Sequence, residues 1–104
     1  MIDLKQLQKD IYKNKLDKGF NVTDINKEFC LAYGEMAEAY EAWRKKQTDV
    51  GEEIADVVIY LLGLSEILNI NLETEILKKV NKNKHRQYKI INVVNTRIKE
   101  YSEE

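Results

Sequence analysis

The sequence predicts an all-α fold of the four-helix-bundle type. Three observations support this prediction. The chain of 104 residues contains no proline, so nothing interrupts long helices. Its four glycines are scattered, and no linker or low-complexity segment divides the chain. Apolar residues recur at spacings of three and four, which is the period of an amphipathic helix. We therefore expect one domain over residues 1–104, with its core in residues 3–88.

The first two helices are predicted at residues 3–18 and 24–46. Gly19 is a natural C-cap for the first, and Thr23 can cap the second. The second helix carries an apolar stripe on one face, which ends in the polar turn 45–49. The stripe consists of Ile25, Phe29, Ala32, Met36, Ala39 and Trp43. A stripe of this kind predicts a helix that packs against its neighbours on that face.

The third helix is predicted at residues 50–69 and is apolar on nearly every side between Val57 and Leu64. Such a helix belongs in a central position. Three neighbours of this length cannot cover it completely, so we expect a homo-oligomer, a dimer or a tetramer, in which a second copy completes the burial.

The end of the chain is less regular. Asn71 caps a fourth helix that extends to about Tyr88. Residues 89–104 form a tail whose structure the sequence leaves open, because IINVV has β-branched character whereas TRIKEYSEE favours a helix.

Composition does not favour a nucleic-acid or membrane partner. The formal net charge of −1 indicates neither nucleic acid nor an anionic membrane as a partner. The longest apolar run, residues 57–64, is far shorter than the roughly 20 residues that span a bilayer. Cys30 is the single cysteine, which excludes an internal disulfide. We expect a cytoplasmic protein that contacts no membrane.

Two pairs of acidic residues, each three positions apart, flank the polar turn. Glu35 and Glu38 form the first pair, and Glu53 and Asp56 form the second. Residues three apart share one side of a helix, and an antiparallel hairpin brings the two pairs to similar heights. Four carboxylates at one place repel each other strongly, and a hard divalent cation such as Mg²⁺ or Mn²⁺ relieves that repulsion. The pattern predicts a metal site.

A solvated helix face is the alternative, because a single acid pair of this spacing is common there. Asp56 argues against it, since it directly precedes the run VVIYLLGL and is hard to leave solvated. Glu41 points to nearly the opposite side of its helix from the apolar stripe and is expected to be solvated. Glu52 lies four residues before Asp56, so its side chain could sit beside that of Asp56. A di-iron site is disfavoured, because the only histidine, His85, lies outside both pairs.

Residues 78–89 are basic and contain no acid. Lys79, Asn83 and Arg86 recur on one helix face, and this set of donors suits phosphate oxygens. Two other interpretations stay open: a solvated helix end that complements the helix dipole, and a contact with nucleic acid.

Two aromatic residues are candidates for stacking on a nucleobase. Phe20 follows the first helix, and the second candidate is Trp43 at the end of the apolar stripe or, alternatively, Tyr40. Aromatic residues are more often part of a core, so both interpretations stay open.

A family resemblance covers roughly residues 18–88. It is carried by GEMAEAYEAWRKK, then GEEIADVVIYLLGLSEILNINLETEI, then KVNKNKHRQY. These segments resemble the MazG-like nucleotide pyrophosphohydrolases, which belong to the all-α NTP pyrophosphatase superfamily. The resemblance implies that fold, completed by oligomerisation. It also implies Mg²⁺ at the positions matching Glu35, Glu38, Glu53 and Asp56, and phosphate contacts from Lys79, Asn83 and Arg86.

The implied reaction is Mg²⁺-dependent hydrolysis of a nucleoside or deoxynucleoside triphosphate to the monophosphate and pyrophosphate, in house-cleaning or control of the nucleotide pool. We expect Glu38 to act as the general base. The family often shows further basic and proline residues after the position of Arg86, whereas QYKIINVVNTRIKEY follows here. The alternative is a non-catalytic helical module that binds nucleotide or a protein partner.

Overall fold

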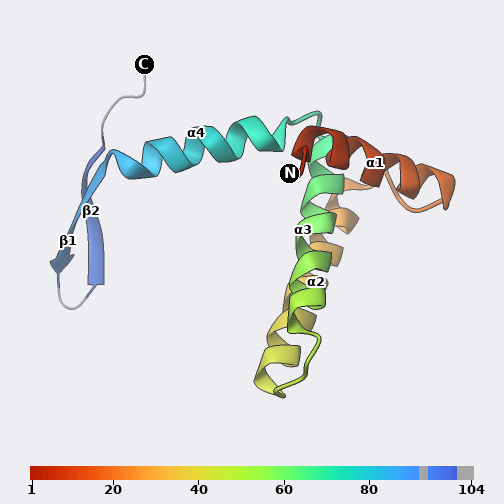
Figure 1. Cartoon of the computed structure of the whole chain (residues 1–104), viewed down its shortest axis with the longest axis horizontal. Helices are drawn as coiled ribbons and strands as arrows, with labels where there is room; N and C mark the ends of the chain where they lie inside the picture. Colours follow the sequence, from red (N-terminus) through yellow and green to blue (C-terminus); the bar gives the residue numbers. More distant parts are fainter. Residues whose placement is uncertain (92–93, 101–104) are drawn as a thin grey trace. The chain divides into compact units, whose positions relative to one another are not determined.

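The computed structural model describes residues 1–91 and 94–100, with side chains up to residue 86. Its elements are α1 (Leu4–Asp17), α2 (Ile25–Arg44), α3 (Val50–Ile67), α4 (Leu72–Lys84), β1 (Arg86–Ile91) and β2 (Val94–Glu100) (Figure 1). They form two compact units, Met1–Leu72 and Glu73–Glu104. The all-α class and its four helices are confirmed, and an antiparallel pair of strands follows them. A single domain over the whole chain stays a prediction.

The first unit is built on a hairpin of two antiparallel helices, α2 and α3, and α1 packs on α3 (Figure 1). α3 contacts both other helices of this unit, which is the central position that its apolar sequence predicts. Among the described helices, none is both long enough and apolar enough to cross a bilayer.

The helices α1, α2 and α3 end in the same way. The residues that follow their C-caps, Gly19, Lys46 and Asn69, have φ of 71°, 57° and 58°. The next backbone N–H then donates to a carbonyl five residues earlier, at 2.8 to 2.9 Å. This turn satisfies carbonyls that the helix end leaves without partners. The predicted role of Gly19 is confirmed.

Two predicted boundaries are wrong. Asp24 rather than Thr23 caps α2, because its carboxylate accepts a backbone N–H three residues further on at 3.0 Å. α4 ends at Lys84 instead of continuing to Tyr88. Residues 94–100 form a strand, so the helical interpretation of that part of the tail is also wrong. Val94, Thr96 and Ile98 in this strand are β-branched, a residue type that strands favour.

The core of the first unit is small. Its buried apolar residues are Ala32, Ala39, Ala42, Leu62 and Leu64. The larger members of the predicted stripe on α2, among them Phe29, Met36 and Trp43, are exposed in the single chain. α2 therefore turns its alanines toward α3, because small side chains let the two helices approach closely.

Several exposed apolar residues of α2 and α3 line one groove, which we call the apolar face. It has a volume of about 510 Å³ and is lined by Met36, Ala39, Tyr40, Trp43, Val50, Ile54, Val57 and Val58. A patch of large apolar side chains is unusual on a protein that stays monomeric.

Polar contacts hold α1 to the rest of the first unit. The buried Gln8 amide donates to Glu66 Oε1 at 2.9 Å and to the carbonyl of Ile70. Its oxygen accepts the N–H of Leu72 at 3.3 Å. A single side chain thus satisfies backbone groups in the turn that follows α3.

A buried ion pair joins α1 to α2. Lys15 Nζ donates to Glu28 Oε1, and Asn21 Nδ2 donates to Glu28 Oε2 at 3.2 Å. The Glu28 residue is only 2% exposed and Lys15 8%. The Lys15 stem passes α3 at Gly63, where a Cβ atom would lie 3.3 Å from it. Glycine at this position allows the close approach.

We expect Lys15→Met to destabilise the fold by about 3 kcal/mol, because it leaves the buried Glu28 carboxylate without its cation. Urea unfolding followed by circular dichroism measures this loss. Lys13→Met is the matched control, since Lys13 is exposed on the same helix. An equal effect of both substitutions would contradict a stabilising role for the ion pair.

Candidate metal and nucleotide site

The predicted acidic residues lie on the hairpin of α2 and α3, and Glu35 lies on the buried side of α2. The buried face of α2 recurs at spacings of four and three through Glu28, Ala32, Ala39 and Ala42, and Glu35 lies within this series. Glu35 is therefore half-buried, whereas Glu38 is exposed.

Carboxylates from both helices converge. Glu35 and Glu38 of α2 and Glu53 of α3 each offer an oxygen atom, and these three atoms lie within 4.8 Å of one another. Asp56 lies outside this group, although its charge reaches both Glu35 and Glu53. The structure thus brings three of the four predicted ligands together and leaves Asp56 beside them. Their role as metal ligands stays a prediction.

The proximity of these acids changes their titration. The pKa of Glu35 is raised above its ordinary value of 4.5 by partial burial, and then by the charges of Glu38, Asp56 and Glu53. The pKa of Glu53 is raised by partial burial and by acidic neighbours that include Asp49 and Glu38. Within the described residues, no lysine or arginine forms an ion pair with any member of this cluster.

Glu41 differs from the cluster although it lies on the same helix. Both of its oxygens accept from Arg44, at 3.1 and 3.0 Å, and Lys45 Nζ lies 3.8 Å away. The hydrogen bonds from Arg44 hold the pKa of Glu41 below its ordinary value. Basic side chains in the described part of the chain therefore neutralise Glu41 and form no ion pair with the cluster.

The predicted phosphate-binding residues belong to the second unit. Asn83 Oδ1 accepts from Arg86 Nη1 at 3.0 Å, and Lys79 is exposed on α4. His85 Nδ1 lies 2.8 Å from the carbonyl of Asn81, which is local to the end of α4. Their approach to the acidic cluster stays a prediction.

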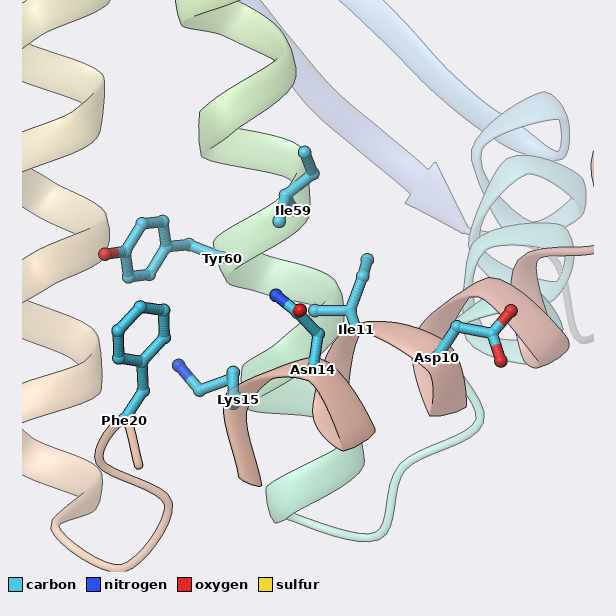
Figure 2. A pocket seen from close by; sticks show the side chains of 7 residues that line it. All are labelled: Asp10, Ile11, Asn14, Lys15, Phe20, Ile59 and Tyr60. Atoms are coloured by element: carbon cyan, nitrogen blue, oxygen red, sulfur yellow. The ribbon is translucent and has the colours of Figure 1, made fainter. Parts of the chain in front are cut away.

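The two aromatic candidates lie in different surroundings. Trp43 stacks on Tyr40 with ring centroids 6.3 Å apart and lines the apolar face. Phe20 lines a pocket of about 360 Å³, together with Lys15 and Tyr60 (Figure 2). Only Phe20 shares a pocket with buried charge.

Sequence reasoning missed Lys15 and Tyr60, which line this pocket, and Glu28, the partner of Lys15. A signal for Lys15 was present, because it continues the apolar series of α1 four residues after Ile11. A lysine at a core position of a helix needs a partner, and Glu28 provides it.

The fold and site define a helical protein with a carboxylate cluster in a hairpin. This chain belongs to the MazG-like family, whose model matches residues 25–103. The match runs from α2 into the tail, and it confirms the resemblance found in the sequence. It favours a function of the nucleotide pyrophosphohydrolase type. Searches of curated proteins and of solved structures gave no match.

Proposed function

We propose that the protein is a Mg²⁺-dependent nucleoside triphosphate pyrophosphohydrolase, which converts a nucleoside or deoxynucleoside triphosphate and water to the monophosphate and pyrophosphate. The observation that supports this most is the convergence of Glu35, Glu38 and Glu53 within 4.8 Å, with no ion pair to a lysine or arginine among the described residues. Membership of the MazG-like family supports the same proposal.

The cluster fits a hard divalent cation. All its donors are carboxylate oxygens, the ligands that Mg²⁺ and Mn²⁺ prefer, and it contains neither histidine nor thiolate. We assign Glu35, Glu38 and Glu53 to the metal, with Asp56 as the fourth ligand. A bound Mg²⁺ would supply positive charge that offsets the carboxylates and the phosphate oxygens of the substrate.

Glu38 is our candidate for the general base. Its side chain is exposed at the edge of the cluster, where it can reach a water molecule. Glu38 would take a proton as the water oxygen bonds to the α-phosphorus. The bond from this phosphorus to the bridging oxygen then breaks, and pyrophosphate leaves.

Residues of the second unit are our candidates for binding the phosphates of the substrate. We assign Lys79, Asn83 and Arg86 to the phosphate oxygens, where their donors would stabilise the charge on the departing pyrophosphate. The hydrogen bond between Arg86 and Asn83 restricts the guanidinium before substrate arrives.

A panel of ribo- and deoxyribonucleoside triphosphates tests the function. We expect release of monophosphate and pyrophosphate in equal amounts with Mg²⁺ or Mn²⁺, no free inorganic phosphate, and no reaction in EDTA. The alternative is a non-catalytic module that binds nucleotide or a protein partner. A melting temperature raised by nucleotide without any turnover would favour that alternative and contradict the proposal.

We also propose that a second copy covers the apolar face, as a homodimer or within a tetramer. Tyr40, Trp43 and Ile54 are too large and too exposed to suit a monomer. A mass of one chain in sedimentation equilibrium would contradict this.

A further inference from the structure

Two pockets of the first unit share one wall. The first, of about 360 Å³, lies between α1 and α3, and the second, of about 320 Å³, lies beside the turn that follows α1. Lys15, Phe20 and Tyr60 line both pockets. Figure 2 shows these three side chains directed at a common space, whereas Asp10 points away from it. Each volume lies near the lower limit of small-molecule sites, which is roughly 300 Å³.

The shared wall contains hydrogen-bond donors with capacity to spare. An ammonium group has three N–H donors and no acceptor. In the described part of the chain, Lys15 donates one of them to Glu28, and its nitrogen lies 5.3 Å from the ring centroid of Tyr60. Both oxygens of Glu28 already accept, from Lys15 and from Asn21. The remaining donors of Lys15 therefore suit an acceptor on a molecule in the pocket.

Tyr60, in the wall of both pockets, lies within reach of the charge of Glu35 in the acidic cluster. Tyr60 follows Asp56 by four residues on α3, which is about one helical turn or roughly 6 Å. Burial raises the pKa of the Tyr60 hydroxyl, and so do the charges of Glu35, Glu28 and Asp56. A nucleotide whose phosphates lie at the cluster can thus place its base between Phe20 and Tyr60, where aromatic rings stack on any base.

The position of Lys15 suggests which edge of the base it contacts. Its partner Glu28 lies seven residues before Glu35 on α2, or about 10 Å along the helix, away from the cluster. The sugar attaches to the side of the base that faces the phosphates. Lys15 therefore lies toward the opposite edge. That edge carries oxygen in uracil, thymine and guanine, and an amino group in cytosine and adenine.

We propose that Lys15 donates a hydrogen bond to this oxygen, so that the site selects uracil, thymine and guanine nucleotides over those of cytosine and adenine. The proposal rests on the proposed function. An amino group at that edge is itself a donor, so it and the Lys15 ammonium would face each other without an acceptor. Unsatisfied donors in a site shielded from water cost binding free energy. Lys15 is thus a specificity residue rather than a catalytic one.

Matched substrates test this directly. The substrates dUTP and dCTP differ at that edge, as do dGTP and dATP. We expect kcat/KM to favour the oxygen-bearing member of each pair by at least about tenfold. Equal values, or a preference for dCTP and dATP, would overturn the inference and leave the proposed function intact.

Variants separate recognition from folding. Lys15→Met removes the donors and keeps the stem, so we expect it to abolish the preference. Because this substitution removes the partner of Glu28, the double variant Lys15→Met/Glu28→Leu is tested alongside it. Lys13→Met, with an exposed side chain on the same helix, is expected to retain the preference. Retention of the preference in a folded Lys15 variant would overturn the inference.

A binding measurement covers the case in which no triphosphate is hydrolysed. Calorimetry with dUMP and dCMP requires neither turnover nor a triphosphate. Tighter binding of dUMP by the wild type, lost in the Lys15 variants, would support the inference even if the proposed function failed. Equal binding, or none, would overturn it.

Discussion

Glu38→Gln is expected to lower pyrophosphate release by about 10²- to 10⁴-fold, because it removes a general base and a charged ligand together. The helical circular dichroism should not change, since Glu38 is exposed and contributes nothing to the buried core. The amide is nearly the same size as the carboxylate, so packing is preserved while charge and basicity are lost.

Glu41→Gln is the matched control for this experiment. Glu41 lies three residues further along α2, but Arg44 and Lys45 neutralise it. We expect its activity to stay within about twofold of the wild type, because exposed ion pairs contribute little. Comparable losses in both variants would show that removing either negative charge from this helix lowers activity, and would contradict the special role of Glu38.

Glu35→Gln is expected to raise the stability of the metal-free protein and to reduce its stabilisation by Mg²⁺. Without metal at pH 7, Glu35 is repelled by Glu38, Asp56 and Glu53, so its neutralisation should raise the melting temperature. The same substitution should remove most of the stabilisation by Mg²⁺. At a concentration 100 times its Kd, Mg²⁺ is expected to raise the wild-type melting temperature by on the order of 10 °C.

The sign of the pH dependence follows from the raised pKa values. The native protein binds protons at Glu35 and Glu53 more tightly than the unfolded chain, whose glutamates titrate near 4.5. Metal-free stability should therefore fall as the pH rises from about 4.5 through the raised pKa values. Glu35→Gln should weaken this fall.

Melting curves in EDTA and in Mg²⁺, recorded across this pH range, measure both effects. Glu41→Gln again serves as the control, because the pKa of Glu41 is lowered and its carboxylate stabilises the fold above that pKa. A lower metal-free melting temperature for Glu35→Gln, or an undiminished response to Mg²⁺, would contradict the repulsion that we infer.

The helices of the hairpin could be predicted from periodicity, and their acidic pairs from spacing, because both depend on local geometry. The end of α4 could not, since no glycine or proline marks it. The buried face of α2 was predicted in part: Ala32 and Ala39 of the predicted stripe are buried, whereas Phe29 and Trp43 are exposed in the single chain. Which residues lie inside depends on how closely the helices approach.

The site was predictable where a repeated sequence pattern marks its residues and unpredictable where none does. Glu35 and Glu38 follow from one helix turn. The Lys15 and Glu28 pair joins two helices across a turn, and neither residue belongs to a motif. The sequence indicates this pair in one way: Lys15 is a charged residue at a position where the apolar series of α1 would continue.

Mn²⁺ is the most direct probe of the central claim, which is that acids from α2 and α3 form one metal centre. In crystals soaked in Mn²⁺, we expect an anomalous difference peak at coordination distance from Glu35, Glu38 and Glu53. That peak should be absent from Glu35→Gln crystals treated in the same way. Saturating Mn²⁺ that gives no peak at this cluster, or a peak held by other residues, would contradict the account.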